Sequence, residues 1–405
     1  MTYESFAIVA AIALSAPLLR ALVPALRVPA IVLELVGGIA IGPHVLGWVH
    51  VDAPIQVFTD IGLALLLFLA GMEIDLERLR GHVLRLASVG FVISFVLGLG
   101  VGELATTAGL DESPLLIAII LVATSLSVII VPLKDAHETS SDFGQLVIAA
   151  ASLAEFGALV LLAFFFSGKR AGLETEALHL GLFALLAVAL AGTVAHRRAE
   201  AGGGGRLGLR LTAAIDVLER TTAQIRVRAD FALVAAAVWL ASLLGLEAIL
   251  AAFTAGVIRG LIRDHQGERA TSQLEAASFG IFIPFFFITS GINFDLGALF
   301  ASASTALRVP AFLLAILFVR SVPAFLYRRM MGGRPMLAAG LLQATSLTFV
   351  VVAAHIGMRL NLMSEATGAA LIGAGLLSVM IFPGAALALL RSSRRGPEPE
   401  PSVAG

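Results

Sequence analysis

The chain alternates between long apolar segments and short polar stretches, and the polar stretches hold most of its charged residues. About thirteen segments are long and apolar enough for membrane helices, since a helix needs about 20 apolar residues to cross a bilayer. Lys and Arg are concentrated in alternate loops, so the positive-inside rule predicts an outside N-terminus and a cytoplasmic C-terminus. The predicted helices cover 5–20, 28–48, 57–73, 84–106, 114–133, 143–167, 177–195, 229–245, 247–262, 276–293, 307–327, 335–357 and 366–390.

Composition agrees with an all-α integral membrane protein and limits the chemistry. The 405 residues are 59% hydrophobic and 14% charged, with no cysteine, which excludes disulfides and thiolate metal sites. No nucleophile with a base, metal cluster or phosphate loop occurs at a suggestive spacing, so we expect neither an enzyme nor a cofactor nor a nucleic-acid partner. Residues 1–4 carry no basic side chain, so the first apolar segment is predicted to be a retained helix.

Glu155 is the only ionisable residue between Gln145 and Ser167, and it lies near the middle of that apolar segment. A carboxylate at the centre of a bilayer costs several kcal/mol unless it is compensated, so such a residue marks a functional site by default. Glu34 and Arg320 also fall inside predicted helices. We interpret both as structural or coupling charges, with Glu34 as a candidate partner for Arg320.

The chain contains an internal repeat. Ala123-Thr124-Ser125-Leu126 recurs as Ala344-Thr345-Ser346-Leu347, 221 residues later, and Gly71 to Leu76 matches Gly291 to Leu296. Equivalent helices are seven apart, so the two halves should face opposite ways in the membrane. Hydroxyl clusters in mid-membrane favour interrupted helices that cross at the midplane, although Thr and Ser can also bond back to their own helix.

We therefore expect one transmembrane domain over residues 1–391. Repeat one covers about 5–167 and repeat two about 229–390. Residues 177–228 would form a linker helix and a cytoplasmic loop that includes the glycine run 202–205. Residues 392–405 are rich in Pro and Glu, a composition typical of a disordered tail.

Two motifs are the most specific in the sequence: Pro29-x4-Glu34-Leu35-x2-Gly38-x3-Gly42-Pro43, and Gly62-x5-Phe68-Leu69-Ala70-Gly71-Met72-Glu73-Ile74-Asp75. Together with Ala123-Thr124-Ser125 they resemble the monovalent cation:proton antiporter-2 family, over nearly the whole chain. The resemblance implies a thirteen-helix, multi-pass protein of the plasma membrane, with a core bundle and a panel that can mediate homodimer contacts. It also implies exchange of a monovalent cation for a proton, by a core that shifts against the panel and presents its site alternately to each side.

This chain departs from the family pattern at the ion site. Where many members carry two adjacent polar residues in the sixth helix, this sequence has Ala154-Glu155, and the lysine that some members carry in the tenth helix is missing. A single carboxylate can hold either one proton or one monovalent cation, which predicts one-for-one, electroneutral exchange. The cation then needs neutral oxygen ligands. The candidates are Thr124, Ser125, Ser152, Gln343 and Thr345.

Two other functions are compatible with the sequence. The altered site could form a passive, channel-like potassium efflux pathway, or Ala154 could mark a transport-inactive member of the family. Proton coupling separates an antiporter from a channel. Among the cations, Na⁺ and K⁺ both fit the residues.

Overall fold

The structure is a computed structural model and describes residues 3–22, 29–72, 81–110, 113–135, 137–139, 141–166, 224–243, 248–261 and 268–394. These residues form helices joined by short turns, and no strand occurs among them. Eight of the described helices are long and apolar enough to cross a membrane. The predicted helix 177–195, the loop that follows it up to residue 223, and residues 395–405 lie outside the described residues. Residues 392–394 were predicted to begin the disordered tail, but they belong to α19 (Glu365–Arg394).

The chain divides into two compact units. The first unit contains the described residues within 1–19, 33–75 and 160–293, and the second contains those within 20–32, 76–159 and 294–405. Each unit draws on both halves of the sequence repeat. The halves are therefore interleaved within each unit rather than folded separately.

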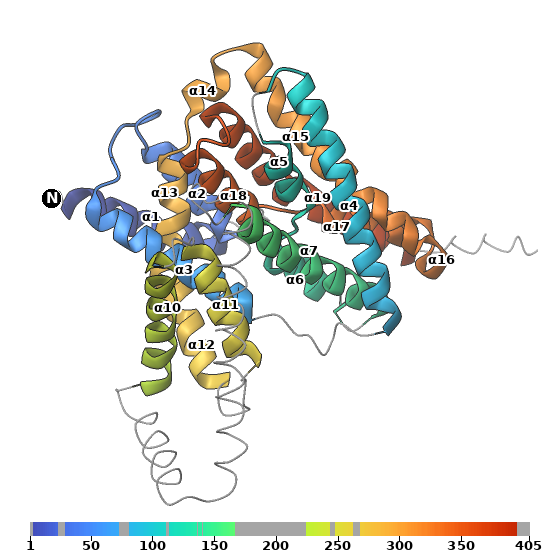
Figure 1. The fold of residues 1–405 in the computed structure, drawn as a ribbon, viewed down its shortest axis with the longest axis horizontal. Coiled ribbons are helices and arrows are strands. Elements are labelled where there is room, and N and C mark those ends of the chain that lie inside the picture. The colour runs from blue at the N-terminus through green and yellow to red at the C-terminus, as the bar shows by residue number, and fades with distance from the viewer. Residues whose placement is uncertain are drawn as a thin grey trace, which may run out of the picture. The chain divides into compact units, whose positions relative to one another are not determined.

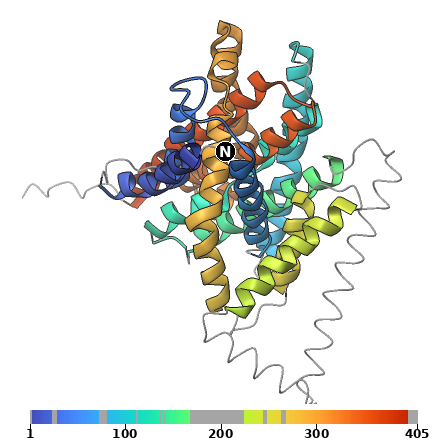
Figure 2. The ribbon, with the colours of Figure 1, turned by 90° about the vertical axis from the view of Figure 1, so that its left-hand side faces the viewer.

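The first unit is built from α1 (Tyr3–Leu22), α2 (Ala30–Ile41), α3 (Ala53–Met72), α10 (Ile225–Leu243), α11 (Ala248–Leu261), α12 (Glu268–Ala277) and α13 (Ile283–Ile292). A π-helical turn, η2 (Ser278–Phe282), joins α12 to α13, and the three follow one another as one rod (Figure 2). Pro284 explains this turn, because proline has no N–H and its ring clashes with the carbonyl four residues back. The Ile283 N–H donates instead to the Ser278 carbonyl, five residues back.

Two close helix contacts in the first unit depend on glycine. A Cβ atom on Gly38 of α2 would overlap the Ile288 carbonyl oxygen of α13, and one on Gly256 of α11 would overlap the Phe68 carbonyl oxygen of α3. Small residues allow this backbone approach in membrane helix pairs. Gly256 follows Gly38 by 218 residues, and Ile288 follows Phe68 by 220. The two contacts are therefore counterparts at the offsets of the sequence repeat.

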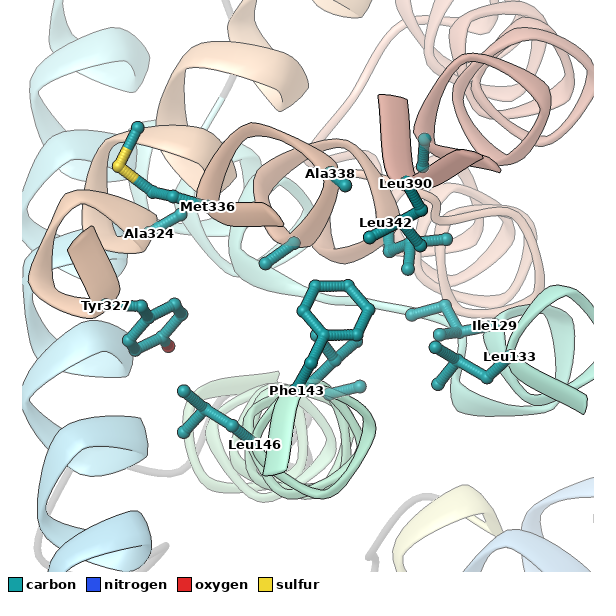
Figure 3. Packing of buried hydrophobic residues seen from close by; sticks show 14 of the residues in the cluster. Ile129, Leu133, Phe143, Leu146, Ala324, Tyr327, Met336, Ala338, Leu342 and Leu390 are labelled. Atoms are coloured by element: carbon teal, nitrogen blue, oxygen red, sulfur yellow. The ribbon is translucent and has the colours of Figure 1, made fainter. Parts of the chain in front are cut away.

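The second unit contains α4 (Gly81–Thr107), α5 (Pro114–Val122), α6 (Leu126–Asp135), α7 (Asp142–Phe166) up to Leu159, α14 (Leu296–Phe300), α15 (Ala303–Ser321), α16 (Arg328–Met331), α17 (Gly333–Gln343), α18 (Thr348–Arg359) and α19 (Glu365–Arg394). A 3-10 turn, η3 (Val322–Tyr327), connects α15 to α16. In Figure 1, α4 runs alongside α5. The core of this unit joins α6 and α7 to α17, where Phe143 points toward Leu342 with Ile129 and Leu133 beside it (Figure 3).

Some helix ends differ from the sequence prediction. The helix expected over 28–48 ends at Ile41, because Pro43 disfavours helical backbone at Gly42, and a turn follows. α10 begins at Ile225, so Arg226 and Arg228 belong to a helix rather than to the predicted linker. The apolar pattern places this start too late, since polar residues at a membrane surface can continue a helix beyond its apolar part.

Candidate functional site

Two helices of the second unit are interrupted at the repeated Ala-Thr-Ser-Leu sequence. α5 ends at Val122 and Ala123 takes an extended conformation, with φ −70° and ψ 154°, before α6 begins at Leu126. α17 ends at Gln343 and α18 begins at Thr348. Thr and Ser hydroxyls offer the backbone hydrogen bonds outside the helical pattern, which is why helices break readily where they cluster.

The two interruptions are hydrogen-bonded to each other. The Ser125 N–H donates to the Thr345 carbonyl over 3.0 Å. In return, the N–H groups of Leu347 and Thr348 donate to Ser125 Oγ over 3.0 and 3.2 Å. The contact between residues 123–125 and 344–348, which we call the crossing, therefore satisfies backbone groups that a broken helix leaves unpaired, as it must where water is scarce.

Glu155 of α7 reaches the first of these interruptions. Its Oε2 atom accepts a hydrogen bond of 3.0 Å from the N–H of Leu126, the first residue of α6. The Glu155 side chain is partly buried. Because the N-terminus of a helix carries partial positive charge, the end of α6 favours an ionised carboxylate at this point.

Arg320 of α15 binds at the C-terminal end of a helix, whereas Glu155 binds at an N-terminal end. Only 2% of its surface is exposed. Its Nε atom donates to Thr124 Oγ1 over 2.9 Å and to the Gln343 carbonyl over 3.3 Å, and Nη1 donates to Ser94 Oγ over 3.0 Å. Gln343 is the last residue of α17, so the guanidinium lies at the partially negative end of that helix.

Each charged residue therefore lies at a helix end of opposite partial charge. Glu155 is at the positive end of α6, and Arg320 is at the negative end of α17. Thr124 strengthens the second contact, because its hydroxyl donates to the same Gln343 carbonyl over 2.6 Å. The hydrogen bonds described for Arg320 all go to neutral groups of its own unit. Glu34, its predicted partner, is a buried residue of the first unit.

The remaining candidate ligands also lie in the second unit. Ser152 is partly buried on α7, and its hydroxyl donates to the Ile148 carbonyl over 2.8 Å. Thr345 is buried and donates to the Leu341 carbonyl over 3.2 Å. The structure thus places seven of the eight predicted site residues in one unit and Glu34 in the other.

Sequence reasoning missed several participants. Ser94 of α4 accepts from Arg320, and Ser378 of α19 accepts a hydrogen bond of 3.1 Å from the Ser346 N–H. Each is a hydroxyl within an apolar stretch of its helix, a signal that marks polar helix contacts in membranes. The backbone N–H of Leu126 carries no residue-specific signal at all.

Among the described residues, no group of three or more His, Cys, Asp or Glu side chains is positioned to hold a metal ion. Within that part of the chain, the crossing combines one carboxylate with hydroxyl and carbonyl oxygens. Small hard monovalent cations bind such oxygen donors.

Comparison with known proteins identifies the family to which the chain belongs. The family model described as sodium/hydrogen exchanger, transmembrane, matches residues 10–391, and the chain belongs to this family. This match confirms that the chain belongs to an antiporter family, as its sequence motifs predicted. The protein is a multi-pass membrane protein of an exchanger family.

Individual relatives are more distant. The chain is 28% identical over 375 residues to the putative Na⁺/H⁺ antiporter YjbQ of Bacillus subtilis, covering 88% of this chain but 58% of that protein. It is 24% identical over 372 residues to a Na⁺/H⁺ antiporter of Enterococcus hirae, covering 88% and 90% of the two chains. The Na⁺/H⁺-K⁺ antiporter GerN of Bacillus cereus is 26% identical over 302 residues, with 72% of each chain covered.

A solved structure shares the fold. The sodium proton antiporter MjNhaP1 of Methanocaldococcus jannaschii, determined at pH 8, superposes with a TM-score of 0.61 at 15% identity. The match covers 95% of this chain and 97% of that one. At this identity the likeness defines the fold alone.

Proposed function

We propose that this protein is a secondary-active antiporter that exchanges a monovalent cation, Na⁺ or K⁺, for a proton. The observation that carries the proposal is the Glu155 carboxylate at the crossing of two interrupted helices, 3.0 Å from the Leu126 N–H. Family membership supports it, and relatives named as Na⁺/H⁺ and Na⁺/H⁺-K⁺ antiporters agree with it.

In this proposal the carboxylate of Glu155 binds either a proton or the cation, never both. Each full cycle then carries one positive charge in each direction, so the exchange is electroneutral. Oxygens near the carboxylate supply neutral ligands. The Ser152 and Thr345 hydroxyls each donate one hydrogen bond to a backbone carbonyl four residues earlier, which leaves oxygen lone pairs for a cation.

Thr124, Ser125 and Gln343 hold the crossing together in the conformation described here. Ser125 accepts from two backbone N–H groups, and Thr124 and the Gln343 carbonyl share Arg320. These contacts favour a framework role. The ligand role expected from the sequence stays a prediction for these three residues.

The mechanism we propose is alternating access by two inverted repeats in a homodimer of the plasma membrane. In this arrangement the C-terminus is cytoplasmic and the chain has thirteen helices. The paired glycine contacts at offsets of 218 and 220 residues support the repeat. Glu155, Arg320 and both interruptions belong to one compact unit, which supports movement of that unit as the carrier.

The experiment that tests this function measures internal pH in liposomes containing the purified protein. Na⁺ or K⁺ is added outside, and the interior should become more alkaline as protons leave in exchange. Clamping the membrane potential should leave the Na⁺-driven rate unchanged if exchange is electroneutral. A cation flux without proton movement would indicate a channel instead, and no flux with any cation would indicate an inactive protein.

A further inference from the structure

Two hydroxyl oxygens in the second interruption are buried without a hydrogen-bond partner among the described residues. They are Ser346 Oγ and Thr348 Oγ1. Ser346 is fully buried, and Thr348 is the first residue of α18 and partly buried. Leaving a buried hydroxyl unsatisfied is costly, so such groups call for a specific explanation.

Hydrogen bonds connect this interruption to Glu155. The Thr348 N–H donates to Ser125 Oγ over 3.2 Å. Ser125 is bonded directly to Leu126, whose N–H donates to the Glu155 carboxylate over 3.0 Å. The first turn of α18 and the carboxylate are therefore separated by two hydrogen bonds and one peptide linkage.

The hydroxyls of the first interruption are engaged in a different way. Ser125 Oγ accepts from two N–H groups, which uses both lone pairs of a hydroxyl oxygen. Thr124 Oγ1 accepts from the Arg320 guanidinium, so a cation bound to it would face a fixed positive charge. By contrast, Ser346 Oγ and Thr348 Oγ1 accept from no described residue.

We propose that the hydroxyl oxygens of Ser346 and Thr348 are neutral ligands of the transported cation and complete its coordination beside Glu155. The inference rests on the proposed antiport function and adds two residues to its site. Oxygen donors of this kind replace part of the hydration shell of Na⁺ or K⁺. A proton on Glu155 needs no such shell, so the two hydroxyls act on the cation step and not on the proton step.

The test compares Ser346→Ala, Thr348→Val and the double variant with the wild type in the liposome assay. The expected result is a rise in the apparent KM for the cation of roughly tenfold or more in the double variant, with the rate at saturating cation retained. Thr348→Ser keeps the hydroxyl and should restore the wild-type KM. A double variant with wild-type KM and rate overturns the proposal.

A second readout does not depend on transport. Cation binding should raise the melting temperature of the purified wild-type protein, because a ligand that binds the native state stabilises it. The double variant should lose most of that rise. Ser94→Ala removes an acceptor of the Arg320 guanidinium and no candidate ligand, so it should lower the melting temperature without cation and leave the cation-induced rise in place. A rise lost in Ser94→Ala and kept in the double variant contradicts the assignment.

Failure of the ligand proposal differs from failure of the function. If the wild type moves no protons in response to Na⁺ or K⁺, antiport itself is wrong. If the wild type exchanges normally and the double variant matches it in KM and in cation-induced stabilisation, only the assignment of Ser346 and Thr348 is wrong.

Discussion

The backbone N–H of Leu126 donates to Oε2 of Glu155 over 3.0 Å, so the first donor of α6 holds the carboxylate at the crossing of two interrupted helices. The N-terminal end of α6 supplies partial positive charge to this acid. It orients an ionised carboxylate without adding a second titrating group.

Removing that single donor should impair exchange. Leu126→Pro deletes the N–H at the first position of a helix, where proline is tolerated because this N–H has no partner within the helix. A hydrogen bond to a charged group contributes about 1.5–3 kcal/mol, so we expect the exchange rate to fall by roughly tenfold or more. Leu126→Val is the matched control, because it trims the side chain similarly and keeps the N–H. Equal rates in the two variants would argue against the role of this bond.

Arg320 should stabilise the second unit. Arg320→Met removes donors to Ser94, Thr124 and the Gln343 carbonyl, and leaves these buried acceptors with fewer partners. We expect the melting temperature of the purified protein to fall by about 5 °C or more. Arg320→Lys should recover only part of the loss, since an ammonium cannot reproduce the planar geometry of the guanidinium. A melting temperature unchanged in Arg320→Met would contradict this role.

The paired glycine contacts predict matched defects in the first unit. Gly38→Ala and Gly256→Ala each place a methyl group against a backbone carbonyl, so two helices must move apart. Overpacking of this kind costs about 1–3 kcal/mol, and both variants should lower the melting temperature and the yield of monodisperse protein. Gly100→Ala on α4 is the control, because a methyl group there meets open space. If all three variants behave alike, the close approach has no structural importance.

The apolar pattern predicts most of the helices in their order along the chain, and the internal repeat identifies both interruptions. The sequence Ala-Thr-Ser-Leu recurs at 123–126 and 344–347, and in both places the structure leaves the helical conformation. A hydroxyl cluster stands out in a membrane helix because the rest of the helix is apolar. It indicates an interruption because the hydroxyls can form hydrogen bonds with nearby backbone groups. Helix ends were less certain, as the termination of α2 at Ile41 shows.

Hydrogen-bond partners could not be predicted in the same way. The sequence suggested Glu34 as the partner of Arg320, because an opposite charge is the simplest compensation for a buried guanidinium. In the structure Arg320 donates to the carbonyl at the end of α17 and to two hydroxyls. Such partners include backbone carbonyls, which every residue carries, so only the three-dimensional arrangement identifies them. The pairing with Glu34 stays a prediction.

The most direct test of the central claim compares wild-type protein with Glu155→Asp and Glu155→Gln in liposomes, following internal pH after external Na⁺ or K⁺ is added. Glu155→Gln keeps the shape but can neither ionise nor hold a proton in exchange. We expect it to reduce the cation-driven pH change to the level of protein-free liposomes, while Glu155→Asp retains measurable exchange. Wild-type exchange by a folded Glu155→Gln protein would contradict the account, because the carboxylate could not then be the shared site for cation and proton.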